Sequence, residues 1–168
     1  GIIKNHGGII NVSSEKGKGT TFTIYLPASR KEITEEKELT HEVSRGKETV
    51  LLIDDEDTII DVGQEIIKAL GYTVLVARSG KEAIEIYEKN KEKIDMVILD
   101  MIMPGMGGGE TYDRIKEINP DIKVLLSSGY SVEGQATEIL KRGCDGFMQK
   151  PFNTRQLSER IRKILDKK

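Results

Sequence analysis

Acidic side chains in this sequence come directly after short apolar runs. Asp54 and Asp55 follow one such run, and Asp100 follows another. Two serines and a lysine come after later runs: Ser127, Ser128 and Lys150. Carboxylates that lie close together raise each other's pKa unless a cation lies among them. Three carboxylates and the Lys150 ammonium leave a formal charge of −2, which one divalent cation would neutralise.

Oxygen ligands of this kind select Mg2+, with Mn2+ as the alternative. Residues 47–168 contain no histidine and a single cysteine, Cys144, so a zinc site is not expected. Any one of the acids could be a helix cap or a solvated loop residue. Their shared position after apolar runs favours a common site over that interpretation.

Parallel βα units would bring these residues together. Short apolar runs alternate with segments of helical period from Lys47 onward. The expected strands are residues 50–53, 73–77, 96–99, 124–126 and 146–149. The first, third and fourth are unbroken apolar runs and should be central. Ligands bind outside the carboxyl ends of the strands in such sheets, so the polar residues should converge there.

Helix signals separate the expected strands. Apolar residues at helical spacing precede a terminating Gly71: Ile59, Ile66, Ile67 and Leu70. Two capping boxes are expected, Ser79 with Glu82 and Asn153 with Gln156. Further helices are expected over residues 109–118 and 131–142. The sequence therefore predicts an α/β fold, a doubly wound (βα)5 domain.

The first part of the chain has a different character. Residues 9–12 and 20–26 are β-type runs on either side of Gly17-Lys18-Gly19, which predicts a β-hairpin. Residues 28–46 are highly charged and predict a linker. The predicted division is therefore 1–27, 28–46 and 47–168.

Composition narrows the class of protein further. The chain is 37% hydrophobic and 32% charged with a net charge of −2, so no basic field attracts nucleic acid or an anionic membrane. No apolar run has the length of a membrane helix, and the lone Cys144 fits a reducing compartment. We therefore expect a cytoplasmic protein. The chain starts at Gly1 rather than at a methionine, and we expect it to be a fragment.

Four motifs together resemble the receiver domain of two-component response regulators, over essentially all of residues 47–168. They are Leu52-Ile53-Asp54-Asp55-Glu56, Leu99-Asp100-Met101-Ile102-Met103-Pro104-Gly105-Met106, Leu126-Ser127-Ser128-Gly129-Tyr130 and Phe147-Met148-Gln149-Lys150-Pro151-Phe152. The resemblance implies a flavodoxin-like sheet with strand order 2-1-3-4-5.

The resemblance also implies that Asp100 accepts a phosphoryl group from a phosphohistidine. Asp55, Asp100 and the backbone carbonyl of Ile102 would ligate Mg2+, and Asp54 would hold the ion through water. Lys150 would offset negative charge on the phosphoryl oxygens.

The remaining implied roles concern the response to phosphorylation. Ser128 would bind the phosphoryl group, and Phe147 would rotate as the switch residue unless it is an ordinary core aromatic. We prefer Ser128 to Ser127 because Gly129 follows it and because strand alternation should point Ser127 away. Ile102 and Tyr130 occupy positions that tune the phosphate lifetime. The glycines within residues 105–109 predict a mobile loop.

Residues 1–27 look like the end of a histidine-kinase ATPase domain, which would make the parent protein a hybrid sensor histidine kinase. The chain lacks the segments that bind Mg-ATP in such kinases, so by itself it is not expected to be a kinase. Whether it is an enzyme at all stays open, since it would catalyse at most its own phosphorylation and dephosphorylation. His6 and His41 do not lie in a four-helix phosphotransfer context.

The expected partner is a histidine kinase or a histidine phosphotransfer protein, with no nucleic acid and no membrane contact. A homodimer through the fourth helix, fifth strand and fifth helix, or through the hairpin, is also open. One alternative function is a degenerate receiver that only binds proteins. Another is a Mg-dependent aspartyl phosphohydrolase, although Ile102 stands where that reaction needs an acid. An FMN-binding domain is a further alternative, opposed by the acidic run from Asp54 to Asp57.

Overall fold

Five parallel strands form the sheet of the larger of two packing units. The computed structural model describes residues 2–28, 44–129 and 135–167. The chain divides into Gly1–His41 and Glu42–Lys168. Ser44 accepts a hydrogen bond from the Ser158 hydroxyl at 2.9 Å, and the Gly46 N–H donates to the Leu70 carbonyl at 3.1 Å. The larger unit therefore extends a few residues to the N-terminal side of the expected start at Lys47.

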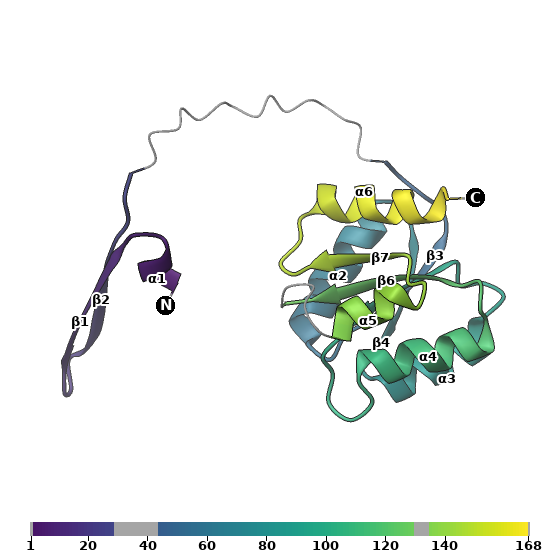
Figure 1. Cartoon of the computed structure of the whole chain (residues 1–168), viewed down its shortest axis with the longest axis horizontal. Coiled ribbons are helices and arrows are strands. Elements are labelled where there is room, and N and C mark those ends of the chain that lie inside the picture. The colour runs from purple at the N-terminus through teal and green to yellow at the C-terminus, as the bar shows by residue number, and fades with distance from the viewer. Residues whose placement is uncertain (1, 29–43, 130–134, 168) are drawn as a thin grey trace. The chain divides into compact units, whose positions relative to one another are not determined.

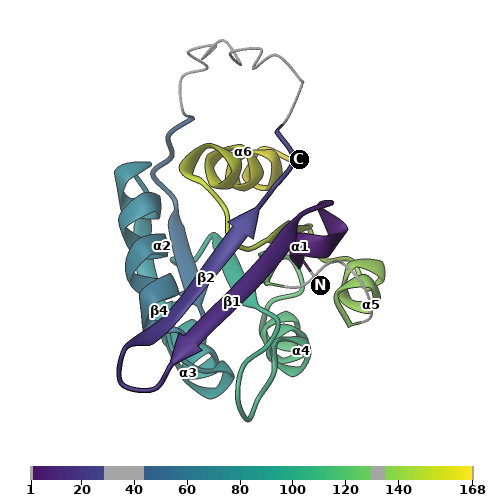
Figure 2. The same cartoon turned by 90° about the vertical axis from the view of Figure 1, so that its left-hand side faces the viewer.

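The smaller unit is the predicted hairpin. The helix α1 (Ile2–Asn5) precedes β1 (Ile9–Glu15), which pairs antiparallel with β2 (Gly19–Tyr25), as Figure 2 shows. Gly17 and Gly19 have φ angles of 84° and 103°, a left-handed conformation that favours glycine in the turn. All residues of both strands are exposed.

The sheet of the larger unit has the expected order. Its strands are β3 (Thr49–Ile53), β4 (Thr73–Ala77), β5 (Met96–Asp100), β6 (Lys123–Ser128) and β7 (Gly146–Gln149). They are all parallel in the order β4-β3-β5-β6-β7, which is the predicted 2-1-3-4-5. The three apolar runs predicted to be central are the three inner strands.

Helices cover both faces of this sheet (Figure 1). They are α2 (Asp57–Ala69), α3 (Gly80–Asn90), α4 (Gly108–Ile118), α5 (Gln135–Lys141) and α6 (Thr154–Leu165). One core cluster contains Ile67 of α2 and Leu157 and Ile161 of α6. The opposite cluster contains Tyr87 of α3, Ile115 of α4 and Ile139 of α5. Within the described residues, every helix is too short or too polar to span a lipid bilayer.

Two helix predictions need correction. In α2 the buried residues include Ile60 and Ile67, whereas Ile59 is only partly buried, so the core stripe begins one residue later than predicted. In α3 the Ser79 side chain caps the Glu82 N–H, but the Glu82 carboxylate accepts from the Arg78 N–H at 2.7 Å. The second half of that capping box is therefore absent. The box of Asn153 and Gln156 is complete, and the start of the helix predicted at 131–142 lies outside the described residues.

Candidate functional site

The three predicted acids meet at the carboxyl edge of the sheet. Asp100 ends β5, and Asp54 and Asp55 follow β3, the strand paired with β5. One carboxylate oxygen of each lies within 4.8 Å of the others. Asp54 and Asp100 are 1% and 4% exposed, whereas Asp55 is exposed to solvent. The site therefore has two buried carboxylates and one open to a ligand.

Lys150 joins two of these acids. It follows β7, and its Nζ lies 2.5 Å from Asp54 Oδ2 and 2.7 Å from Asp100 Oδ1. The second oxygen of each carboxylate accepts a hydrogen bond from a backbone N–H. Asp54 Oδ1 accepts from Glu56 at 3.1 Å, and Asp100 Oδ2 accepts from Ile102 at 2.9 Å. These four bonds orient both carboxylates.

Burial and charge act in opposite directions on these groups. Burial raises the pKa of Asp100, the Lys150 ammonium lowers it, and the Asp54 carboxylate raises it again, with a net upward shift. Burial by itself lowers the pKa of Lys150, but its hydrogen bonds to Asp100 and Asp54 outweigh this and the net shift is upward. Lys150 is therefore a fixed positive charge at neutral pH.

A cavity of about 550 Å³ opens beside the acids. Its lining residues are Asp55, Glu56, Ile59, Asp100, Ile102, Gly129, Lys150 and Pro151. Ile102 is 58% exposed and, with Ile59, gives the cavity an apolar side. The helical spacing had placed Ile59 on the apolar stripe of its helix, and Glu56 had been given no role at the site. A one-residue shift of the α2 stripe is the signal that would have placed Ile59 here.

The donor set fits a divalent cation. Carboxylate oxygens predominate, and they carry more negative charge than Lys150 offsets, which is the chemistry of a Mg2+ site. Lys150 pairs with Asp54 and Asp100, whereas the exposed Asp55 carboxylate faces the cavity. Asp54, the most buried of the three, is held by Lys150 and the Glu56 N–H.

Both serines of β6 are buried beside the site. The strand register pairs Asp100 with Ser127, so alternation along β6 does not by itself separate Ser127 from Asp100. Ser128 adjoins Gly129, which lines the cavity. The Ser128 carbonyl accepts a hydrogen bond from the backbone N–H of Lys150 at 2.7 Å. The preference for Ser128 therefore stands on Gly129 and not on alternation.

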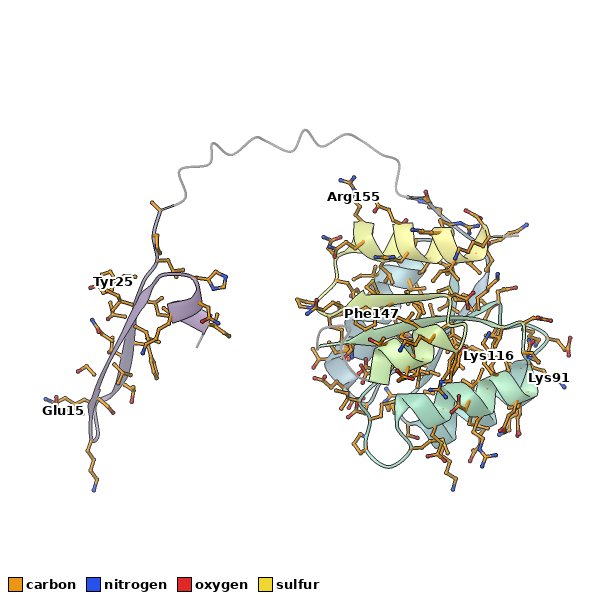
Figure 3. All side chains as sticks on the ribbon, in the orientation of Figure 1. Glu15, Tyr25, Lys91, Lys116, Phe147 and Arg155 are labelled. Carbon is orange, nitrogen blue, oxygen red and sulfur yellow. The ribbon has the colours of Figure 1, made fainter. Side chains whose placement is uncertain are left out.

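The predicted switch residue lies on the edge strand β7. Phe147, labelled in Figure 3, is partly buried and packs against the core cluster that α3, α4 and α5 cover. It also lines a cavity with Gln149, Gln156 and Arg160. Tyr130 lies outside the described residues.

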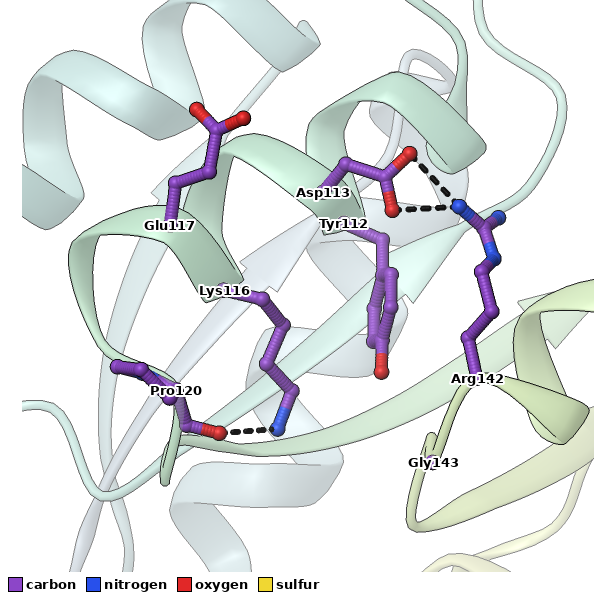
Figure 4. A pocket seen from close by; sticks show the side chains of 7 residues that line it. All are labelled: Tyr112, Asp113, Lys116, Glu117, Pro120, Arg142 and Gly143. Carbon is purple, nitrogen blue, oxygen red and sulfur yellow. Dashed lines mark hydrogen bonds and ion pairs between the residues drawn. The ribbon is translucent and has the colours of Figure 1, made fainter.

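A second and larger cavity, of about 680 Å³, lies between α4 and the end of α5. Arg142 donates to both carboxylate oxygens of Asp113, at 2.6 and 2.7 Å, and Lys116 donates to the Pro120 carbonyl at 2.9 Å (Figure 4). Both cations also lie within 6 Å of the Tyr112 ring centroid, at 5.7 and 5.9 Å. Both cationic side chains are engaged within the protein, and the Arg142–Asp113 pair links the end of α5 to α4. This cavity is therefore not the candidate site.

Comparisons with known proteins agree with this geometry. The model of the response regulator receiver domain family matches residues 50–162. The chain therefore belongs to the family of response regulator receiver domains of two-component systems.

Two curated relatives match nearly the whole chain. The sensor kinase CckA of Brucella abortus (strain 2308) is 36% identical, over 99% of this chain and 19% of that protein. The aerobic respiration control sensor protein ArcB of Escherichia coli (strain K12) is 31% identical, over 98% of this chain and 21% of that protein. The chain thus spans a minor part of these sensor proteins.

Solved structures match the larger unit. A receiver domain protein of Clostridium thermocellum has a TM-score of 0.68 and 32% identity, over 71% of this chain and 94% of that chain. A CheX–CheY–BeF3–Mg2+ complex of Borrelia burgdorferi has a TM-score of 0.68 and 26% identity, over 71% and 90%. These similarities agree with the flavodoxin-like fold that the sequence predicted.

Proposed function

We propose that this domain takes a phosphoryl group from a phosphohistidine onto Asp100. The observation that carries the proposal is the paired set of Asp54, Asp100 and Lys150 beside an open cavity. Asp100 lines the cavity, where a phosphoryl donor can reach its carboxylate. The adjacent Lys150 ammonium offsets negative charge on the oxygens of the transferred phosphoryl group.

The reaction is an exchange of one bond for another. A carboxylate oxygen of Asp100 attacks phosphorus, and the P–N bond to the donor imidazole breaks, with its electron pair leaving on nitrogen. Lys150 lies 2.7 Å from Asp100 Oδ1, close enough to contact a phosphoryl group bonded there. The same groups would serve hydrolysis of the aspartyl phosphate by water.

Asp55, Asp100 and the Ile102 carbonyl would hold a Mg2+ ion directly, and Asp54 would hold it through water; Mn2+ could replace it. When bound, the ion supplies positive charge that stabilises the phosphoryl oxygens. The Borrelia CheY complex, which contains Mg2+ and BeF3, supports this proposal. Glu56 at the cavity wall is not assigned to the ion.

Phosphorylation replaces one negative charge on Asp100 with about two, so the product needs a further donor. We assign this role to Ser128, and Phe147 would then rotate and change the surface formed by α5, β7 and α6. Ile102 and Tyr130 would tune the phosphate lifetime.

The similarity to CckA and ArcB supports a hybrid sensor histidine kinase as the parent protein, with residues 1–27 as the end of its ATPase domain and 28–46 as a linker. The partner would be a histidine kinase or a phosphotransfer protein in the cytoplasm. Homodimers could form through α5, β7 and α6 or through the hairpin.

Intact mass after incubation with Mg2+ and acetyl phosphate tests the proposal. We expect one phosphoryl adduct on the native chain, none in the presence of a chelator and none on Asp100→Asn. An adduct that survives in Asp100→Asn would mean another acceptor. Absence of both the adduct and Mg2+ binding after rapid quenching would instead favour a degenerate receiver that only binds proteins.

A further inference from the structure

The loop after the phosphoacceptor closes on the backbone of the phosphoacceptor itself. The Met101 N–H donates to the Ser127 carbonyl at 3.0 Å, and the Met101 carbonyl accepts from the Gly108 N–H at 3.1 Å. Residue 101 therefore ties β6 on one side to the first residue of α4 on the other. Ile102, which is the proposed carbonyl ligand, lies inside this closed loop.

Gly108 is buried at the closure point with no space for a side chain. A Cβ atom built on it would overlap the Asp100 carbonyl oxygen and would lie 2.7 Å from Met101 Cα and 3.1 Å from the Met101 carbonyl oxygen. All three are backbone atoms, which cannot rotate away as a side chain can. Real Cβ atoms essentially never approach other atoms within 3.0 Å, so an added methyl group must displace the backbone.

Packing on its other side keeps the start of α4 from moving away from the Asp100 backbone. Its Thr111 is fully buried, and the Thr111 hydroxyl donates to the Gly107 carbonyl at 2.9 Å. On the opposite side α3 begins at the buried Gly80, where an added Cβ would overlap Thr111 Oγ1 and lie 2.8 Å from Met106 Cγ. The start of α4 is thus held between Gly80 and the backbone of Asp100.

The neighbouring glycines differ from Gly108. A Cβ built on Gly107 would meet no atom within 4 Å, and its φ of −72° suits any residue. Gly105 also has open space but needs its φ of 75°. Gly107 therefore provides a control of the same residue type, one position away.

We propose that Gly108 is a positioning residue for the phosphoacceptor. Without a side chain it lets α4 close against the Asp100 carbonyl, which holds the Asp100 carboxylate and the Ile102 backbone where a cation and a phosphoryl group need them. The inference rests on the proposed function of Asp100. Gly108 would thus set the geometry of the site without contacting either the cation or the phosphoryl group.

The test compares Gly108→Ala with Gly107→Ala in the full chain. We expect Gly108→Ala to weaken Mg2+ binding, measured by isothermal titration, by about tenfold or more and to slow adduct formation with acetyl phosphate by at least as much. Gly107→Ala should stay within about twofold of the native chain in both. Ile161→Val, in the other core cluster, should lower the melting temperature through lost packing but leave Mg2+ affinity within about twofold.

Thr111→Val provides a second variant in case Gly108→Ala does not fold. The Gly107 carbonyl keeps its bond from the Thr111 N–H at 3.0 Å, so the substitution leaves no unpaired carbonyl. Loosening of the loop end should weaken Mg2+ binding by about threefold.

Native Mg2+ affinity and rate in a folded Gly108→Ala would overturn the inference while leaving the proposed function intact. If Gly108→Ala does not fold, unchanged Mg2+ affinity in Thr111→Val would overturn it. A native chain that neither binds Mg2+ nor forms an adduct would overturn both.

Discussion

Asp54 and Asp100 are two buried carboxylates that share one ammonium group. Taking charged groups out of water costs several kcal/mol each, and the cost is offset only when partners and hydrogen bonds remain in place. Lys150 and the backbone N–H groups of Glu56 and Ile102 supply those partners. The site therefore depends on Lys150 for stability as well as for the proposed chemistry.

Replacement of Lys150 by Met should destabilise the metal-free protein by about 3 kcal/mol at neutral pH, because it leaves buried carboxylates without a counterion. Added Mg2+ should restore part of the loss. Urea unfolding with a chelator and with Mg2+ measures both effects. The control is Lys141→Met, whose exposed pair with Glu138 should contribute less than about 0.5 kcal/mol. Equal losses in the two variants would contradict this expectation.

The two serines of β6 can be separated by substitution. We expect Ser128→Ala to slow adduct formation with acetyl phosphate by about 10- to 100-fold, since a hydrogen bond to a charged group contributes about 1.5–3 kcal/mol. Ser127→Ala should have a smaller effect. Time-resolved intact mass distinguishes them, and a larger effect of Ser127→Ala would transfer the role to Ser127, the register partner of Asp100.

The loop from residue 105 to 109 does not have one uniform environment. Gly105 and Gly107 have open space around them, whereas Gly108 is packed and its N–H is bonded to Met101. The predicted mobility therefore applies to residues 105–107. Their amides should exchange with deuterium faster than those of β5, and protection equal to that of the central strands would refute the prediction.

At the level of elements, α6 is anchored to the start of β3. Arg162 Nη1 lies 2.7 Å from Glu48 Oε1, Arg162 Nη1 donates to the Tyr72 hydroxyl at 3.5 Å, and Arg162 Nη2 pairs with Asp166. Burial by itself raises the pKa of Glu48, but the hydrogen bond from Arg162 and backbone donors outweigh it and the net shift is downward. The pair therefore stabilises the fold when Glu48 is ionised.

Arg162→Met should lower the free energy of unfolding by about 1 kcal/mol at pH 7, because the pair is only partly exposed. A lowered pKa means that the contribution of Glu48 is present above its ordinary value of 4.5 and is lost as pH falls through the lower folded value. The native and variant proteins should therefore approach each other in stability only as the pH falls below 4.5, through the lowered pKa of Glu48. Arg155→Met, on the exposed face of the same helix, is the control, and a pH-independent difference would contradict the assignment.

At the level of the whole molecule, the two packing units differ in what they bury. Both strands of the hairpin are exposed along their full length, including Ile9, Val12 and Phe22, which are 60% or more exposed. A two-stranded hairpin without a covered face is marginally stable in water. The larger unit holds all the buried core residues that the structure describes.

Removal of residues 1–41 should therefore leave the folding and the phosphoryl chemistry of the larger unit unchanged. We expect residues 42–168 to have a melting temperature within about 2 °C of the full chain and the same rate of adduct formation. Calorimetry and intact mass measure these quantities. A much lower melting temperature would mean that the hairpin contributes to the core. A molecular mass in sedimentation that rises with concentration only for the full chain would support dimerisation through the hairpin.

Local pattern determined much of this fold. The five strands, their order and the Asn153 capping box follow from apolar runs, glycines and caps that act over a few residues, together with a family resemblance. The three acids and Lys150 were placed together because parallel strands end at one edge. These inferences need no knowledge of side-chain packing.

Contacts between distant segments decided the rest. Ile59 faces the cavity and Ile60 the core, and the strand register pairs Asp100 with Ser127 rather than with Ser128. Gly108 looked like one of several loop glycines, and only the tertiary structure shows that it packs against the backbone of Asp100 and Met101. Sequence alone determined which elements form and which acids meet. Only the packed structure could decide that the backbone of Asp100 and Met101 leaves no space for a methyl group on Gly108, because steric overlap depends on tenths of an ångström.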